Sequence, residues 1–336
     1  MVNFVENDYP AMTSKLKQEM RSYFKDDSLF QSDYYLKDPN DNTLFGIKQP
    51  YWDMFDKGDG GELTEKDGEP AKSAAIHSSS MLAYNFFSWI NESNPFIYEG
   101  VKYDKVVFEE HLRVLEYGTS DHIHFPKSTA TANLDVVLAG TNEEGKTSLL
   151  FIESKFTEHL SNARSELNNM VLSYSTPECY FDNGIAWASL VEAWKDRAKS
   201  ILPKGYYNGI KQDICHLLAI SNLINGHTRN WFNKEGSTGD EGSWLKKIYS
   251  LSISGDEEIK FRNVIFSPSL RYKADAQDVK NYRSLYSLFE EDVKRIIPSS
   301  LEIGLVTYAE IWKAMEPCIK DESLKRYLKE RYISFQ

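Results

Sequence analysis

Two short apolar runs joined by a turn-forming segment constrain the fold of this chain more than any other feature of its sequence. The runs are Leu134 to Ala139 and Ser148 to Ile152, and the segment 140–146 between them contains Gly140 and Asn142. Apolar runs of this length around such a segment predict a β-hairpin with a long connecting loop. We expect this hairpin to lie at the centre of the fold.

Three charged residues interrupt the predicted hairpin. Asp135 lies inside the first run, while Glu153 and Lys155 close the second, two residues apart and therefore on one face of the strand. Burying an isolated carboxylate or ammonium is costly unless the group is paired or binds a metal. Two carboxylates converging from neighbouring strands beside a lysine suit a divalent-cation site for attack of water on a phosphodiester. The alternative is that Glu153 and Lys155 form only a salt bridge at a strand end.

These residues resemble the PD-(D/E)xK motif of the restriction-endonuclease-like nuclease superfamily. Asp135 is separated by 17 residues from Glu153, and Leu134 stands where the motif's name has a proline, a position that is loosely kept. An earlier predicted strand, VVFEEHLRVL at residues 106–115, adds two further acids. Three segments resemble a bacterial branch of the superfamily over residues 73–270, namely HSSSMLAYNFF from His77, FEE from Phe108 and IESKFTE from Ile152.

The resemblance implies an α/β fold with the αβββαβ core of restriction endonucleases, in which helices flank a central mixed sheet. Core strands are expected at residues 104–117, 132–139, 148–155 and 261–267, with helices at 73–90 and 208–224. Outside the core, the hydrophobic pattern predicts helices at 10–25, 275–295 and 309–332 and a strand at 301–308.

The expected organisation has three parts. Residues 1–72 form an acidic, aromatic extension packed on the core, and a Gly-rich acidic loop at 57–70 marks its boundary. Residues 73–270 form the nuclease-like core, with a helical insertion at 158–204. Residues 271–336 form a C-terminal α/β extension.

The resemblance also implies the residues of the site. Asp135, Glu153 and Glu109 would bind Mg²⁺ or Mn²⁺ together with the carbonyl of Ser154, and Lys155 would orient or deprotonate the attacking water. The residues expected to contact substrate or support this site are Ser78, Ser79, Asn85, Glu110 and Gln212. Two alternatives stay open: the serines and Asn85 also suit close approach of a helix to the sheet, and Gln212 also suits a core helix.

Composition and charge limit the class of function. Of the 336 residues, 41% are hydrophobic and 13% aromatic, which is ample for a core. The net charge of −11 argues against tight non-specific DNA binding, although residues 1–72, with nine Lys and Arg against fifteen Asp and Glu, carry more than half of it. The chain shows no transmembrane run, signal-peptide pattern or disulfide-like cysteine spacing, so we expect a cytoplasmic protein without a membrane partner.

Together these observations predict a metal-dependent nuclease, with DNA as the expected substrate, in restriction, defence or repair. A nucleic-acid-binding or assembly subunit that keeps the fold without cutting is the alternative, and the acidic charge favours it. A third reading is an unrelated α/β protein in which the Glu153–Lys155 pair is structural. A homodimer is compatible with the first reading, because cutting both strands of a duplex usually needs two sites.

Overall fold

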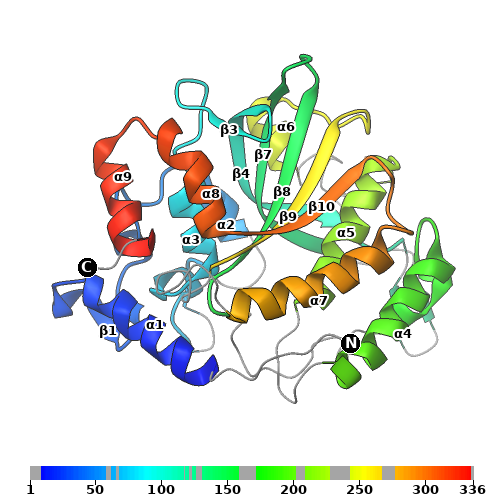
Figure 1. The fold of residues 1–336 in the computed structure, drawn as a ribbon, viewed down its shortest axis with the longest axis horizontal. Helices are drawn as coiled ribbons and strands as arrows, with labels where there is room; N and C mark the ends of the chain where they lie inside the picture. Colours follow the sequence, from blue (N-terminus) through cyan, green and yellow to red (C-terminus); the bar gives the residue numbers. More distant parts are fainter. Residues whose placement is uncertain are drawn as a thin grey trace.

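A six-stranded mixed sheet lies at the centre of the protein, with the strand order β10-β9-β8-β7-β4-β3 (Figure 1). The structure, a computed structural model, describes residues 9–57, 62–65, 68–116, 118–120, 123–125, 131–158, 172–201, 209–227, 243–266 and 277–333. Within the sheet, β3, β4, β7 and β8 pair antiparallel, whereas β9 and β10 continue parallel to β8. The strands are β3 (Phe96–Tyr98), β4 (Val101–Arg113), β7 (Thr131–Asn142), β8 (Thr147–Lys155), β9 (Glu258–Ile265) and β10 (Leu301–Thr307). The prediction that four core strands share one mixed sheet is confirmed.

The predicted hairpin is formed by β7 and β8. Both strands extend further into the connection than expected, so that Thr141 pairs with Thr147 and only a tight turn remains. The side-chain oxygen of Asn142 accepts two backbone N–H groups within this turn, and Gly145 adopts φ +79°. Asn and Gly favour such turns because they tolerate positive φ or bond their own backbone.

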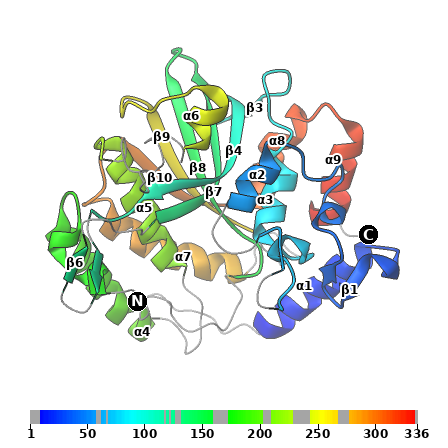
Figure 2. The same ribbon diagram turned by 180° about the vertical axis from the view of Figure 1, so that it is seen from behind.

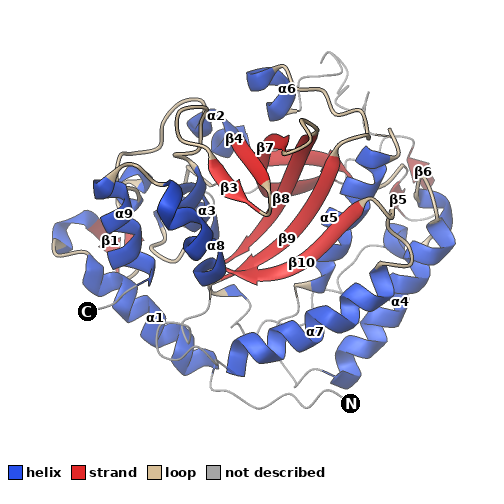
Figure 3. Ribbon diagram, turned by 45° about the horizontal axis from the view of Figure 1, so that its top comes forward, coloured by secondary structure: helices blue, strands red, loops and turns tan. Residues whose placement is uncertain are grey.

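Helices cover both faces of the sheet (Figure 3). α3 (Ser79–Phe87) and α8 (Tyr308–Met315) lie on one side, and α5 (Ile210–Ile224) and α7 (Gln277–Val293) lie on the other. As a result, every residue of β8 after Thr147 is buried. A strand covered on both faces needs apolar residues on both, which explains the uninterrupted run in β8.

The helix expected at 73–90 is shorter in the structure. Lys72–Ala74 forms one 3-10 turn, and α3 begins only at Ser79, with Ser78 as its N-cap. Between them Ala75 forms a bridge with Tyr35 of the N-terminal segment, and this pairing draws the backbone out of the helix. A long-range contact therefore overrides the local helical pattern.

The C-terminal helix expected at 309–332 is also broken. α8 is followed by a 3-10 turn at Glu316–Cys318 that contains Pro317, and α9 (Glu322–Leu328) starts again with Asp321 as N-cap. Proline cannot continue a helix, and the aspartate caps a new one. β10, from the same C-terminal segment, extends the central sheet beside β9.

The remaining elements surround this core. α1 corresponds to the helix expected at 10–25, and α7 to that expected at 275–295. Residues 159–171 and 202–204 of the expected helical insertion lie outside the described residues. These elements are α1 (Tyr9–Tyr23), β1 (Phe30–Ser32), β2 (Tyr35–Leu36), α2 (Tyr51–Lys57), β5 (Gly118–Ser120), β6 (Ile123–Phe125), α4 (Gly184–Ile201) and α6 (Trp244–Tyr249). Among the described helices, none is long and apolar enough to span a membrane.

Candidate active site

The strands β7 and β8 stop pairing where their acidic residues begin. The last paired residues are Val136 and Ile152, and the same register places Asp135 opposite Glu153. Beyond that point the backbone N–H of Ser154 donates to Asp135 Oδ2 at 2.7 Å instead of to a strand carbonyl. The register thus places the two carboxylates on one face of the hairpin, at the point where the strands separate.

Lys155 completes this group from the same strand. Its Nζ donates to Glu153 Oε1 and, at 2.7 Å, to Gln212 Oε1 on α5. The exposed fractions are only 4% for Lys155 and 2% for Glu153. A buried ion pair of this kind is costly to desolvate, so it points to a functional role more than to a gain in stability. Gln212, on the face of α5 toward β8, contacts Lys155 directly.

The neighbouring acidic residues make it costly for Asp135 to be ionised. Burial raises the pKa of Asp135 well above its ordinary value, and Glu153 and Glu109 raise it further, with Lys155 only partly offsetting them. Glu109 lies across from Asp135 on β4, where the neighbouring pair is Phe108 with Val136. Its φ is +50°, a strained value for a non-glycine residue inside a strand. A bound cation would offset the repulsion between the negative charges of these acids.

α5 adds two titratable residues that the sequence did not single out. His216 Nδ1 lies 3.3 Å from Glu153 Oε2, and Asp213 Oδ1 accepts a 2.9 Å hydrogen bond from Asn263 Nδ2. Burial lowers the pKa of His216 and raises that of Asp213 to about 7. The available signal was the polar set Gln212, Asp213 and His216, which follows the spacing of one helical face in the first half of a largely apolar helix.

Glu110, which was expected to contact substrate or support the site, bonds instead to a neighbouring helix. Its Oε2 accepts the backbone N–H of Trp244 at 2.8 Å, at the start of α6, which lies next to β4 (Figure 2). Burial raises the pKa of Glu110 to about 7, against the hydrogen bonds that favour its ionised form. Neighbouring strand residues point to opposite faces, so only one of Glu109 and Glu110 can face Asp135.

The small polar residues of α3 have mainly structural contacts. Ser78 caps the helix, and the backbone carbonyl of Ser79 accepts the hydroxyl of Ser154 at 3.1 Å on the side of β8 away from α5. The Ser79 side chain also forms a hydrogen bond with Glu158. Burial raises the pKa of Glu158, but the charge of Lys155 and this hydrogen bond lower it, and the net pKa is below its ordinary value. Ser78 and Ser79 therefore let α3 approach β8 closely.

Asn85 lies outside the site and joins two distant parts of the chain. Its amide donates to the carbonyl of Asn42 at 3.0 Å and to the hydroxyl of Tyr332 at 2.9 Å. Arg331 donates to the same Asn42 carbonyl at 2.7 Å. The structure places Asn85 in this buried network and not beside Asp135 and Glu153, where a residue that contacts substrate or supports the site was expected.

The residues present fit a hydrated divalent cation. Within the described part of the chain, no three of the His, Cys, Asp and Glu side chains are arranged to hold a metal. Yet among the described residues Glu153 Oε2 is buried without a hydrogen-bond partner, and Asp135 lies opposite Glu153 in the strand register. Mg²⁺ retains several waters and takes one or two carboxylates, so this donor set is sufficient for it.

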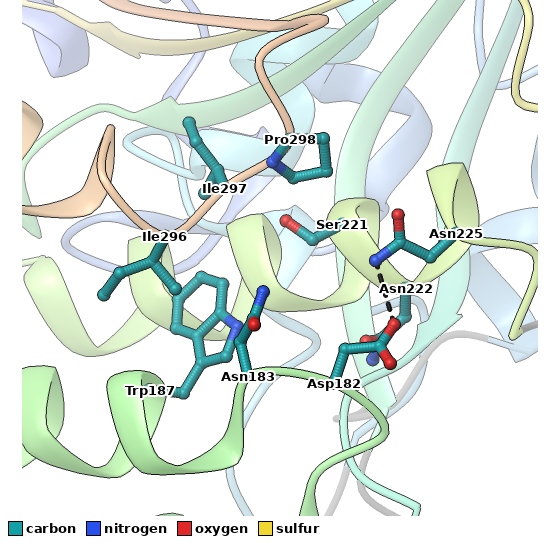
Figure 4. Close-up of a pocket in the computed structure, with 9 residues that line it drawn as sticks. All are labelled: Asp182, Asn183, Trp187, Ser221, Asn222, Asn225, Ile296, Ile297 and Pro298. Carbon is teal, nitrogen blue, oxygen red and sulfur yellow. Dashed lines mark hydrogen bonds between the residues drawn. The ribbon is translucent and has the colours of Figure 1, made fainter.

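A cavity at the other end of α5 is separate from these residues. It has a volume of about 190 Å³ and lies where α4, α5 and the segment before β10 meet (Figure 4). Asn225 from α5 donates across it to Asp182 at 3.0 Å, and Trp187 lines one wall. The site residues of β7 and β8 do not line it.

The mixed sheet and the acidic hairpin with its lysine define a restriction-endonuclease-like α/β protein. A family model agrees: residues 13–207 match the family described as Restriction Endonuclease associating with ARP. This match covers more than half of the chain, including the whole β7–β8 hairpin, and the chain belongs to that family. No curated protein and no solved structure matches the chain.

Proposed function

We propose that this protein is a metal-dependent nuclease that hydrolyses phosphodiester bonds in DNA. The observation that carries the proposal is the opposition of Asp135 and Glu153 where β7 and β8 separate, with Lys155 bonded to Glu153. Membership of a restriction-endonuclease family supports DNA as the substrate.

The chain's own residues would divide the work as follows. Asp135, Glu153 and Glu109, with the Ser154 carbonyl, would hold Mg²⁺ or Mn²⁺. Such an ion, when bound, supplies Lewis-acid polarisation and charge neutralisation at the phosphate. The ammonium of Lys155 would orient the attacking water and stabilise charge that develops on the phosphate. Gln212 keeps that ammonium in place through its 2.7 Å hydrogen bond.

Plasmid cleavage in the presence of Mg²⁺ or Mn²⁺ tests this function directly. The parent protein should nick or linearise DNA with either ion and lose the activity when the ion is chelated. Asp135→Asn should be inactive under the same conditions. If the parent does not cleave DNA even when an associating protein is added, the alternative function is favoured, a nucleic-acid-binding or assembly subunit that keeps the fold without cutting.

The acidic charge suggests that DNA binding is shared with a partner. A net charge of −11 gives little non-specific attraction to phosphate, and the family description names association with ARP. We propose that this chain likewise works in a complex with such a protein, which would supply DNA contacts. Co-purification and DNA retention with and without the co-expressed partner would test this. A homodimer that supplies two sites for the two strands is the alternative assembly, and light scattering would detect it.

A further inference from the structure

His216 brings a nitrogen atom to the carboxylate pair. It lies on α5 with an exposed fraction of 4%, and its Nδ1 is 3.3 Å from Glu153 Oε2. Both atoms are buried, and in the described part of the chain neither has a hydrogen-bond partner. The opposite oxygen, Glu153 Oε1, already accepts from Lys155. A cation approaching Glu153 therefore meets the oxygen that faces His216.

The other side of the imidazole is fixed by the strand that carries Asp135. The backbone of Asn133 accepts a hydrogen bond from the His216 ring, and because Nδ1 has no hydrogen-bond partner among the described residues, this bond belongs to Nε2. The Nε2 proton then defines the tautomer, and the lone pair of Nδ1 points toward the lone pairs of Glu153 Oε2. Two buried acceptors in such proximity repel each other unless a cation or proton lies between them.

We propose that His216 Nδ1 and Glu153 Oε2 are two ligands of one transition-metal ion. This inference rests on the proposed function, because it adds a residue to the same metal site. Ligands about 2.1 Å from a metal and about 90–110° apart lie about 3.0–3.4 Å from each other. The observed separation of 3.3 Å falls in this range. A backbone carbonyl on the second ring nitrogen is also the usual support of a metal-binding histidine.

The nitrogen ligand gives the site a metal preference. Imidazole suits transition metals, whereas Mg²⁺ favours carboxylate, carbonyl and water oxygens. Asp135, opposite Glu153, and water would complete the coordination shell. The site therefore takes Mn²⁺ in preference to Mg²⁺, and His216 is the residue that sets this selectivity.

Electron spin echo modulation of the Mn²⁺-loaded full chain tests the proposal without any substitution. Protein labelled with [¹⁵N]histidine should show the modulation of a directly bound imidazole, shifted relative to unlabelled protein. If Mn²⁺ binds but the isotope leaves the spectrum unchanged, His216 is no ligand, although the carboxylate metal site of the proposed function stands. If neither Mn²⁺ nor Mg²⁺ binds, both proposals are wrong.

A matched pair of variants then assigns the signal to this residue. His216→Gln should remove the nitrogen modulation and weaken Mn²⁺ binding by at least ~10-fold, the lower end of the losses seen for metal-supporting groups, while Mg²⁺ binding changes much less. His227→Gln is the control, because His227 pairs with Asp182 beside the separate cavity. Equal losses for both ions, or a modulation that survives His216→Gln, would overturn the assignment.

Discussion

The Nζ of Lys155 donates a 2.7 Å hydrogen bond to Oε1 of Gln212, which ties the end of β8 to the start of α5. The two residues are 57 positions apart in the chain. Because Lys155 also bonds Glu153, its ammonium is held between a carboxylate and an amide. The proposed function gives these residues two roles that substitutions can distinguish, metal binding by the acids and rate enhancement by the lysine.

Replacing Lys155 should slow cleavage without abolishing metal binding. A charged ammonium has no lone pair for a metal, so Lys155→Ala should hold Mg²⁺ at least as well as the parent. Cleavage should fall at least ~10²-fold, since positioned proton-transfer groups contribute about 10²–10⁴-fold. Single-turnover cleavage and calorimetric Mg²⁺ titration measure the two effects. Lys146→Ala, at an exposed position of the β7–β8 turn, is the control and should match the parent. A folded Lys155→Ala protein that cuts at the parent's rate would rule out the proposed mechanism.

Replacing Asp135 should abolish metal binding and leave the protein at least as stable. Burial and the neighbouring Glu153 and Glu109 disfavour the ionised form of the Asp135 carboxyl group. Removing its negative charge therefore relieves repulsion in the folded protein. In Asp135→Asn the amide oxygen can still accept the N–H of Ser154. Calorimetry with Mn²⁺ and thermal unfolding without metal are the measurements. Asp256→Asn, on an exposed loop, serves as control. Parent-like Mn²⁺ binding by Asp135→Asn would contradict the metal role of this residue.

Glu110 should make stability depend on pH. Burial raises the pKa of its carboxyl in the folded protein from 4.5 to about 7. Between these values the folded chain keeps a proton that the unfolded chain has lost, so stability falls as pH rises and the loss is complete above the folded pKa. The difference corresponds to about 3 kcal/mol.

Denaturant unfolding at about pH 5 and at about pH 8 measures this dependence. Glu110→Gln should lose less stability than the parent across the interval, because the amide does not titrate. The difference between the two proteins isolates Glu110 from the other titrating groups. An identical pH dependence in parent and variant would show that this carboxyl titrates normally.

Asn85 should prove important for stability and not for metal binding. Its buried amide donates to the Asn42 carbonyl and to the Tyr332 hydroxyl, and Asn85→Ala removes both of these hydrogen bonds, although Arg331 still donates to Asn42. An unsatisfied buried group costs about 1–3 kcal/mol, so the free energy of unfolding should fall by roughly that amount. Mn²⁺ titration of the folded variant should match the parent. If Asn85→Ala weakened Mn²⁺ binding and left the free energy of unfolding unchanged, Asn85 would be a residue that supports the metal site.

The sequence by itself determined the local parts of this protein. The apolar runs, their length and the turn residues between them predicted the β7–β8 hairpin, because these signals depend on neighbours along the chain. That Glu153 and Lys155 share one face of a strand likewise followed from the sequence, since residues two apart in a strand point to the same side. The helix at 208–224 was also predictable from its apolar pattern, and it corresponds to α5.

Only the tertiary structure decided which side chains meet. Packing of α5 on the sheet brought His216 to Glu153, and strand register left Glu110 facing α6 while Glu109 lies opposite Asp135. The side-chain amide of Asn85 donates to the hydroxyl of Tyr332, which is 247 positions away in the chain. β10 likewise joined the sheet from a segment that the sequence assigned to a separate extension. These outcomes depend on the packing free energy between distant segments, which no local pattern of residues encodes.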